Sequence, residues 1–285
     1  MKSTCLIIVF KHGRALDKFI MYSATVLAKK YIRYRFNASN GKGHGVHSPF
    51  VFDFIKNVLR SNKTLPFAKA VEARRSLLLD DKRVIEVKDF GAGSTMIKTN
   101  NRGVAAMAKS SLKPKKYAHL IASIIQHFDA KTVLELGTSF GITTSYLALA
   151  NPNGKVYSFE GAPTIAQIAK EQFGALDIKN IELTLGDFDD TLTPFIKTAP
   201  SMDLFFLDGN HKKQPTLDYF ERLFPLAKDS SIFIFDDIHW SEEMEAAWEE
   251  IKKDKRVTLT IDLFFIGIVF LKKEFLVKQD FIIKF

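Results

Sequence analysis

From residue 116 onward, short apolar runs alternate with longer segments whose apolar residues recur at helical spacing, and this alternation restricts the possible folds more than any other feature. Two runs, DLFFLD at 203–208 and SIFIFDD at 231–237, are apolar at almost every position, which is typical of central parallel strands covered on both faces. We therefore expect an α/β fold with a parallel sheet between two layers of helices. The predicted strands are 132–136, 155–160, 181–186, 203–208 and 231–237, and the predicted helices are 116–128, 141–150, 163–173, 189–198, 215–227 and 241–253.

Two further strands, 257–262 and 265–271, close the predicted sheet. The few residues between them are too short for a crossover helix, so the two strands must pair antiparallel. The sequence thus predicts a Rossmann-like sheet of seven strands whose last two form an antiparallel pair.

The charge of the chain is unevenly distributed. The net charge is +9 over 285 residues, but residues 1–116 carry +17 and residues 117–285 carry −8. Such a split indicates two parts with different roles. A basic part can bind nucleic acid, acidic lipid or an anionic substrate, although surface lysines also simply keep a helical region soluble.

The basic part is predicted to be mainly helical. Helices are expected at 17–36, at 49–60 with Ser48 as N-cap and Pro49 in the first turn, and at 66–79, followed by a short strand at 84–87. Pro114 lies in the basic segment SLKPKK, where we place the boundary between an N-terminal cap region, 1–115, and the α/β domain, 116–285.

Several classes of protein are disfavoured by the composition. The single cysteine, Cys5, excludes an internal disulfide framework and any multi-cysteine metal site, and it fits a reducing compartment, so we expect a cytoplasmic protein. The apolar run CLIIVF at 5–10 is too short to cross a bilayer, and no cleavage site of a signal peptide follows it.

Two glycine-rich segments, DFGAGS at 89–94 and ELGTSFG at 135–141, are each candidates for a nucleotide-binding turn. Only the second has a strand before it, a helix after it, and a second strand ending in an acid, Glu160, about twenty residues further on. No second strand is expected after DFGAGS, so we interpret it as a turn of the cap region that closes over the substrate side of the pocket. A nicotinamide cofactor is disfavoured, because the glycines of ELGTSFG have G-x-x-x-G spacing.

The stretch ELGTSFGITTSYLALA resembles motif I of the class I S-adenosylmethionine-dependent methyltransferases, in particular their O-methyltransferase branch, and the likeness covers about residues 116–271. The resemblance implies S-adenosylmethionine as cofactor. It also implies that Glu135 and Gly137 lie near the methionine part, that Glu160 binds the ribose hydroxyls, and that Asp187 and Phe188 border the adenine. The complete predicted cofactor set is Glu135, Gly137, Thr138, Ser139, Gly141, Glu160, Asp187 and Phe188.

Three carboxylates, those of Asp208, Asp236 and Asp237, follow neighbouring predicted strands and should converge at the carboxyl edge of the sheet. Converging carboxylates repel one another unless a cation or protons intervene. All-oxygen ligation suits Mg²⁺ or a similar divalent ion, which lowers the pKa of a bound hydroxyl. The alternative is that these acids bond to helix N-termini and are structural.

The same segment resembles the metal-dependent O-methyltransferases of the catechol type, and more closely the sugar-modifying, macrocin type. By this resemblance Asp208 and His211 are the candidate catalytic residues, and His211 stands where the catechol type carries a lysine base. A histidine that is largely neutral at pH 7 suits a general base; alternatively, His211 caps the next helix or contacts the cofactor. Two departures from the pattern, Asn210 for an acid and Asp237 for an amide, weaken the metal hypothesis.

The remaining histidines and the second tryptophan are less informative. The segment GKGHGVHSPF resembles the start of an uncharacterised bacterial group of methyltransferase-like proteins. His44 and His47 either line the acceptor pocket, form half of a metal site, or only structure the loop. His239 and Trp240 either shape the pocket or pack under the helix that follows them, and for Trp240 we expect packing.

The sequence as a whole predicts an O-methyltransferase that acts on a small-molecule or sugar-like hydroxyl. The segment DGNH replaces the Asn/Asp-Pro-Pro-aromatic motif of enzymes that methylate base amino groups, which argues against that activity. Two alternatives stay open: an RNA methyltransferase that uses the basic N-terminal region, and a non-catalytic binding module. A homodimer is compatible with the sequence.

Overall fold

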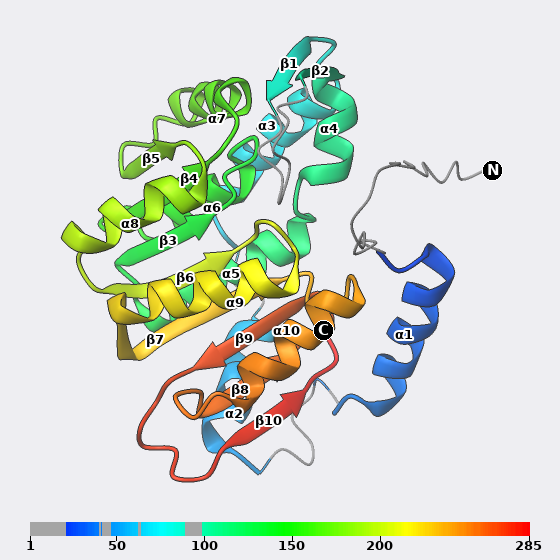
Figure 1. Ribbon diagram of the computed structural model, residues 1–285, viewed down its shortest axis with the longest axis vertical. Helices are drawn as coiled ribbons and strands as arrows, with labels where there is room; N and C mark the ends of the chain where they lie inside the picture. Colours follow the sequence, from blue (N-terminus) through cyan, green and yellow to red (C-terminus); the bar gives the residue numbers. More distant parts are fainter. Residues whose placement is uncertain (1–20, 40, 42–46, 62–63, 89–98) are drawn as a thin grey trace, which may run out of the picture.

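The computed structural model describes residues 21–39, 41, 47–61, 64–88 and 99–285 of the chain. Its largest feature is a sheet of eight strands with helices on both faces (Figure 1). The strands follow one another across the sheet in the order β10-β8-β9-β7-β6-β3-β4-β5. Their bounds are β3 (Thr132–Leu136), β4 (Lys155–Glu160), β5 (Ile181–Leu185), β6 (Met202–Leu207), β7 (Ala227–Asp236), β8 (Leu259–Asp262), β9 (Ile266–Phe270) and β10 (Gln279–Ile282).

The predicted pairing of the strands is confirmed. Strands β3 to β7 are parallel, and β9 runs antiparallel to both β7 and β8. An eighth strand, β10, adds to the seven predicted ones and lies parallel to β8 at the edge of the sheet. It has only four residues, two of them the polar Gln279 and Asp280, and so gives a weak strand signal in the sequence.

Side chains of alternate strand residues point to opposite faces, so the sheet has two apolar clusters. On β6, Leu204 and Phe206 belong to the cluster under α5 and α6, whereas Phe205 and Leu207 belong to the cluster under α9 and α10. Phe205 stacks on Phe233 of the neighbouring strand with ring centroids 4.1 Å apart. The helices that cover the sheet are α5 (Lys115–Phe128), α6 (Ile142–Ala150), α7 (Pro163–Ala175), α8 (Phe188–Thr198), α9 (Lys213–Leu223) and α10 (Glu242–Lys253).

The described residues of the N-terminal region between 49 and 111 pack on the face that α5 and α6 cover. Ser48 caps the predicted helix, and its hydroxyl accepts a hydrogen bond from the Val51 amide at 3.5 Å. Buried residues of this region, such as Phe54 and Val71, share one apolar cluster with α5 and α6, so the packing is continuous across the predicted boundary at 115/116. The helices are α1 (Ala24–Asn37), α2 (Pro49–Phe54) with a π-helical turn at Ile55–Leu59, α3 (Ala68–Leu79) and α4 (Val104–Ser111).

A hairpin precedes α4 and corrects one prediction. Strand β1 (Val84–Lys88) was expected, but a second strand, β2 (Thr99–Gly103), follows it and pairs antiparallel. An antiparallel partner cannot form the parallel strand–helix–strand unit that holds a nucleotide. DFGAGS itself lies outside the described residues, as does His44.

Among the residues that the structure describes, no helix combines the length and the apolar character needed to cross a membrane.

Candidate functional site

The turn from β3 to α6 depends on two glycines. Gly137 and Gly141 have φ angles of 100° and 77°, and Ser139 between them is also left-handed, with φ of 50°. A Cβ atom on Gly137 would lie 2.2 Å from the carbonyl oxygen of Asp208, and one on Gly141 would lie 2.6 Å from the ring of Phe173. The sequence of the turn therefore lets the ends of β3 and β6 approach at the carboxyl edge of the sheet.

Glu160 at the end of β4 is bonded to this turn. Its Oε2 accepts a hydrogen bond from the Ser139 amide and its Oε1 from the Ala162 amide, each at 2.9 Å. Burial raises the pKa of Glu160, although these amides oppose the rise. The acid predicted for the cofactor therefore lies beside the glycine turn, with its ionised form supported by backbone donors.

Glu135 lies beneath the turn and is completely buried. Its Oε2 accepts hydrogen bonds from the hydroxyls of Thr144 and Ser158, each at 2.6 Å, while its Oε1 has no partner among the described residues. Burial raises the pKa of Glu135 to about 8, against the effect of the two hydroxyls. Thr138 joins the same group through its hydroxyl, 2.5 Å from that of Ser158.

The glycine turn and the acidic cluster open into one cavity of about 580 Å³. Gly137, Ser139 and Glu160 line it on one side, and the linker between α4 and α5 lines another. Its remaining walls include the predicted acids and histidine and two aromatic side chains: Asp208, His211, Asp236, Asp237, Trp240 and Phe265. Trp240 thus lies in the cavity wall, and the prediction that it packs under the next helix was wrong.

Five of the eight predicted cofactor residues are not among those that line this cavity. Glu135, Thr138 and Gly141 belong to the turn or lie beneath it, whereas Asp187 and Phe188 lie at the start of α8. Asp187 is the N-cap of α8, and its side chain accepts a hydrogen bond from the Asp189 amide at 2.8 Å. Phe188 packs edge-on against Tyr219, with ring centroids 5.7 Å apart. His47 also lies elsewhere, in a cleft beside Phe50 and Phe275.

A lysine that was not predicted from the sequence lies among the carboxylates. The Lys113 ammonium is bonded to Asp236 and lies 3.3 Å from Asp208, and the Lys113 side chain is only 10% exposed. Burial opposes its charge, but Asp208 and Asp236 outweigh burial and raise the pKa of Lys113. The converging acids predicted that a cation is needed. Lys113 was not recognised as that cation, because the segment SLKPKK was interpreted as a basic hinge.

The three acids differ in their surroundings. Burial acts against the ionised form of Asp208, but Lys113 and His211 outweigh it and lower the pKa of this acid. Burial and the charge of Asp208 raise the pKa of Asp236, and burial raises that of Asp237. Asp236 is 1% exposed, and its Oδ1 has no hydrogen-bond partner among the described residues.

His211 lies next to this cluster. Its Nε2 is 3.5 Å from Asp208 Oδ1, and its side chain is 30% exposed. Both Asn210 and His211 adopt left-handed backbone angles, and the Asn210 amide donates to the Tyr219 hydroxyl, which fixes the turn after β6. Of the predicted metal ligands, Asp208 and Asp236 form with His211 a group whose ligand atoms lie within 4.8 Å of one another; Asp237 is not part of that group.

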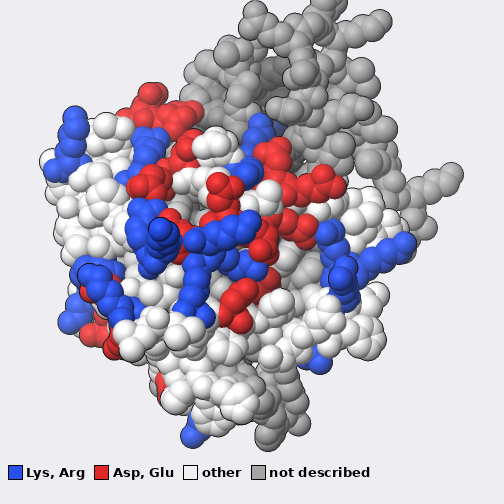
Figure 2. All heavy atoms as spheres, turned by 60° about the horizontal axis from the view of Figure 1, so that its bottom comes forward, with Lys and Arg blue, Asp and Glu red and all other residues white. Residues whose placement is uncertain are grey.

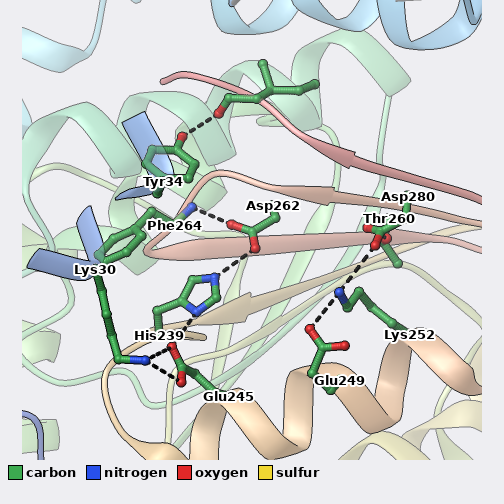
Figure 3. A network of polar contacts seen from close by, with 11 residues as sticks. Lys30, Tyr34, His239, Glu245, Glu249, Lys252, Thr260, Asp262, Phe264 and Asp280 are labelled. Carbon is green, nitrogen blue, oxygen red and sulfur yellow. Dashed lines mark hydrogen bonds and ion pairs between the residues drawn. The ribbon is translucent and has the colours of Figure 1, made fainter. Parts of the chain in front are cut away.

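A polar network attaches α1 to the loops beside the cavity (Figure 3). The His239 ring bridges Glu245 of α10 at 2.9 Å and Asp262 of β8 at 2.8 Å. Lys30 of α1 donates to the same Glu245, at 2.9 and 3.0 Å. Because Trp240 follows His239 directly, the network holds the cavity wall as well as the helix.

The comparisons with known proteins agree with this geometry. A family model described as "Methyltransferase domain" matches residues 134–238. The curated catechol O-methyltransferase of Niastella koreensis is 26% identical over 163 residues, which are 55% of this chain and 72% of that protein. These matches support a class I methyltransferase that is similar to O-methyltransferases, with the matched domain at residues 134–238.

Solved methyltransferases share the fold of this methyltransferase. A putative caffeoyl-CoA O-methyltransferase from Staphylococcus aureus has a TM-score of 0.52 at 18% identity, over 58% of this chain and 90% of that one. A Podospora anserina methyltransferase bound to SAH has a TM-score of 0.54 at 12% identity, over 90% of this chain and 100% of that one. At such low identities the likeness concerns the fold alone.

The backbone geometry of the glycine turn can be tested by measuring the stability of variants at Gly137. Gly137→Ala should lower the free energy of unfolding by at least about 2 kcal/mol, because the methyl group meets the Asp208 carbonyl and φ stays positive. Gly174→Ala is the matched control, since a Cβ there meets nothing within 4 Å and alanine favours the helix. The measurement is urea denaturation, and an unchanged midpoint for Gly137→Ala would contradict the geometry.

The His239 network predicts a pH-dependent stability. Burial lowers the pKa of His239, but hydrogen bonds to Asp262 and Glu245 outweigh it and raise the pKa to about 9. Because the folded value exceeds the unfolded value of about 6.5, the stabilisation is complete below about pH 6.5 and is lost as the pH rises through 9. The difference in unfolding free energy between wild type and His239→Gln should therefore be largest near pH 6, on the order of 3 kcal/mol, and small above pH 9.

His47→Gln, a substitution at an exposed histidine outside this network, is the matched control. A His239→Gln difference that is constant from pH 6 to pH 10 would show that the network does not depend on the imidazolium charge.

Proposed function

We propose that this domain transfers a methyl group from S-adenosylmethionine to a hydroxyl of a small-molecule or sugar-like acceptor. The observation that carries the proposal is the shared cavity, in which the glycine turn with Glu160 faces the cluster of Asp208 and His211. A methyl transfer needs the donor and the acceptor oxygen aligned within one enclosed space. The curated catechol O-methyltransferase relative supports the same class of acceptor.

The residues around the turn fit the proposed cofactor. Glu160 uses each carboxylate oxygen for one backbone hydrogen bond and keeps further lone pairs that suit ribose hydroxyls. Gly137 and Ser139 bring backbone into the same cavity wall, and the unpartnered Oε1 of Glu135 adds a buried acceptor near the predicted methionine part. We assign Asp187 and Phe188 to the adenine border by the family resemblance. When bound, the cofactor supplies a methyl group activated by its sulfonium.

We propose that His211 is the general base that accepts the proton of the substrate hydroxyl. Its side chain lines the cavity, and its Nε2 lies 3.5 Å from Asp208 Oδ1, so Asp208 can orient the ring. A partly exposed imidazole can then release this proton to solvent between turnovers. Trp240 and Phe265 give the same region apolar walls, which suits a ring or an aliphatic skeleton.

The residues present do not fit the predicted divalent ion in this arrangement. Asp208, Asp236 and His211 have a suitable spacing and suitable ligand atoms. The Lys113 ammonium, however, is already bonded to Asp236 and close to Asp208, and Lys113 lines the same cavity. We therefore derive no step of the reaction through a metal ion.

The RNA alternative rests on the basic N-terminal region, but several of its charges already have partners. Arg75 pairs with Glu72, Arg83 pairs with acids of the hairpin region and α7, and Lys30 pairs with Glu245. The face drawn in Figure 2 carries Lys and Arg interspersed with Asp and Glu. These observations favour a small acceptor held in the cavity.

Cofactor binding tests the first half of the proposal. Titration calorimetry with S-adenosylhomocysteine should give saturable binding, and Glu160→Gln should weaken it about tenfold, because a charged acceptor for two hydroxyls is lost. Glu182→Gln on β5 is the control, since its side chain is 54% exposed and should not affect binding. Absence of binding to the wild type at millimolar ligand would refute the proposed function.

Methyl transfer tests the second half. With labelled S-adenosylmethionine and a panel of catechols, sugars and other hydroxyl compounds, we expect one class to accept the label. His211→Gln should lower kcat for that acceptor about 100-fold or more while the affinity for S-adenosylhomocysteine stays within about twofold. Equal turnover by wild type and His211→Gln would remove His211 from the proposed role, and cofactor binding with no acceptor in the panel would favour a binding module.

A further inference from the structure

Lys113 lies in a short linker beside the cavity, and contacts with other elements fix the position of this linker. The linker joins α4 to α5, and Pro114 caps the start of α5. Arg75 of α3 donates to the Lys113 carbonyl oxygen at 2.7 Å, and the hydroxyls of Ser111 and Ser139 lie 3.2 Å apart. The linker is thus tied both to the N-terminal helices and to the glycine turn, which defines the position of the lysine.

Negatively charged side chains outnumber positively charged ones in the cavity wall around Lys113. The cavity wall contains four carboxylates, those of Glu160, Asp208, Asp236 and Asp237. Among the described residues that line it, Lys113 is the only lysine or arginine. Its ammonium is bonded to Asp236, 1% exposed, and is close to Asp208, 17% exposed, so it neutralises the acids that burial places furthest from water.

We infer that the Lys113 ammonium takes the role of the divalent cation, and that this methyltransferase acts without a metal. Magnesium requires near-octahedral oxygen ligation at about 2.0–2.1 Å, which Asp208 and Asp236 cannot supply while they hold an ammonium group between them. An ammonium has three N–H donors. Two are directed at the carboxylates, which leaves one donor for an acceptor oxygen in the cavity.

The chemical role of Lys113 described next rests on the proposed function, methyl transfer to a hydroxyl. The acceptor oxygen forms a bond to the methyl carbon while the carbon–sulfur bond of the donor breaks and its electron pair stays on sulfur. The hydroxyl proton passes to His211, so that a neutral ether, a neutral thioether and an imidazolium result. Lys113 keeps its proton throughout and stabilises the negative charge that develops on the oxygen, in a site largely shielded from water.

A metal-binding measurement tests the inference without cofactor or acceptor. Mn²⁺ binding is followed by electron paramagnetic resonance on wild type, Lys113→Met and the control Lys115→Met, whose lysine is exposed two residues away. We expect no binding to wild type or to Lys115→Met at about 1 mM Mn²⁺, and binding at least about tenfold tighter to Lys113→Met, because its carboxylates have lost their cation. The additional change Asp236→Asn should abolish the gained site.

Micromolar Mn²⁺ binding to wild type that is lost in Asp236→Asn would overturn the inference, and this result needs no folded Lys113 variant. Absence of Mn²⁺ binding to a folded Lys113→Met would also overturn it, because the acids would then not form a cation site. Once an acceptor is known, turnover by wild type should survive EDTA, whereas Lys113→Met should lose about 100-fold in kcat and retain its affinity for S-adenosylhomocysteine within about twofold. A failure of cofactor binding would refute the proposed function but leave the Mn²⁺ result intact.

Discussion

Negative charge buried at the carboxyl ends of parallel strands is the constraint on which the site depends. Strands β3, β4, β6 and β7 end at one edge of the sheet, and each carries an acid at or beside its end. Water cannot solvate these groups fully, so each acid needs a protein partner. Glu135 is bonded to two hydroxyls, Glu160 to two amides, and Asp208 and Asp236 to one ammonium. The different partners divide the edge into a side with backbone donors and a side with a fixed cation.

The N-terminal region contributes directly to the cation side of this site. The ammonium comes from the linker after α4, and α3 fixes that linker through Arg75. On another side of the cavity, Lys30 of α1 is bonded to Glu245, which also holds His239 next to the cavity residue Trp240 (Figure 3). The basic charge of the region, which the sequence offers as a possible nucleic-acid surface, is thus used in part for internal ion pairs. In the proposed reaction, the N-terminal region therefore supplies a charge to the active site and does not only close over it.

The sequence predicted the sheet well because its strands are long apolar runs, and it predicted the turn because Gly137, Gly141 and Glu160 have the spacing that such a turn requires. Elements with weak patterns were missed. Strand β2, TNNRG, contains no apolar residue, and β10 has only four residues at a sheet edge. Lys113 was missed for another reason: its partners follow in the chain by 95 residues or more, and no local pattern distinguishes a buried lysine from an exposed one. The position of Trp240 likewise depends on contacts distant in sequence.

A crystal structure of the protein grown with S-adenosylhomocysteine and Mn²⁺ would report the cofactor side and the cation side of the cavity together. We expect density for the ligand against Gly137 and Glu160, with the Lys113 ammonium between Asp208 and Asp236 and no anomalous manganese peak at those carboxylates. A manganese peak coordinated by Asp208 and Asp236, with Lys113 displaced, would contradict this expectation.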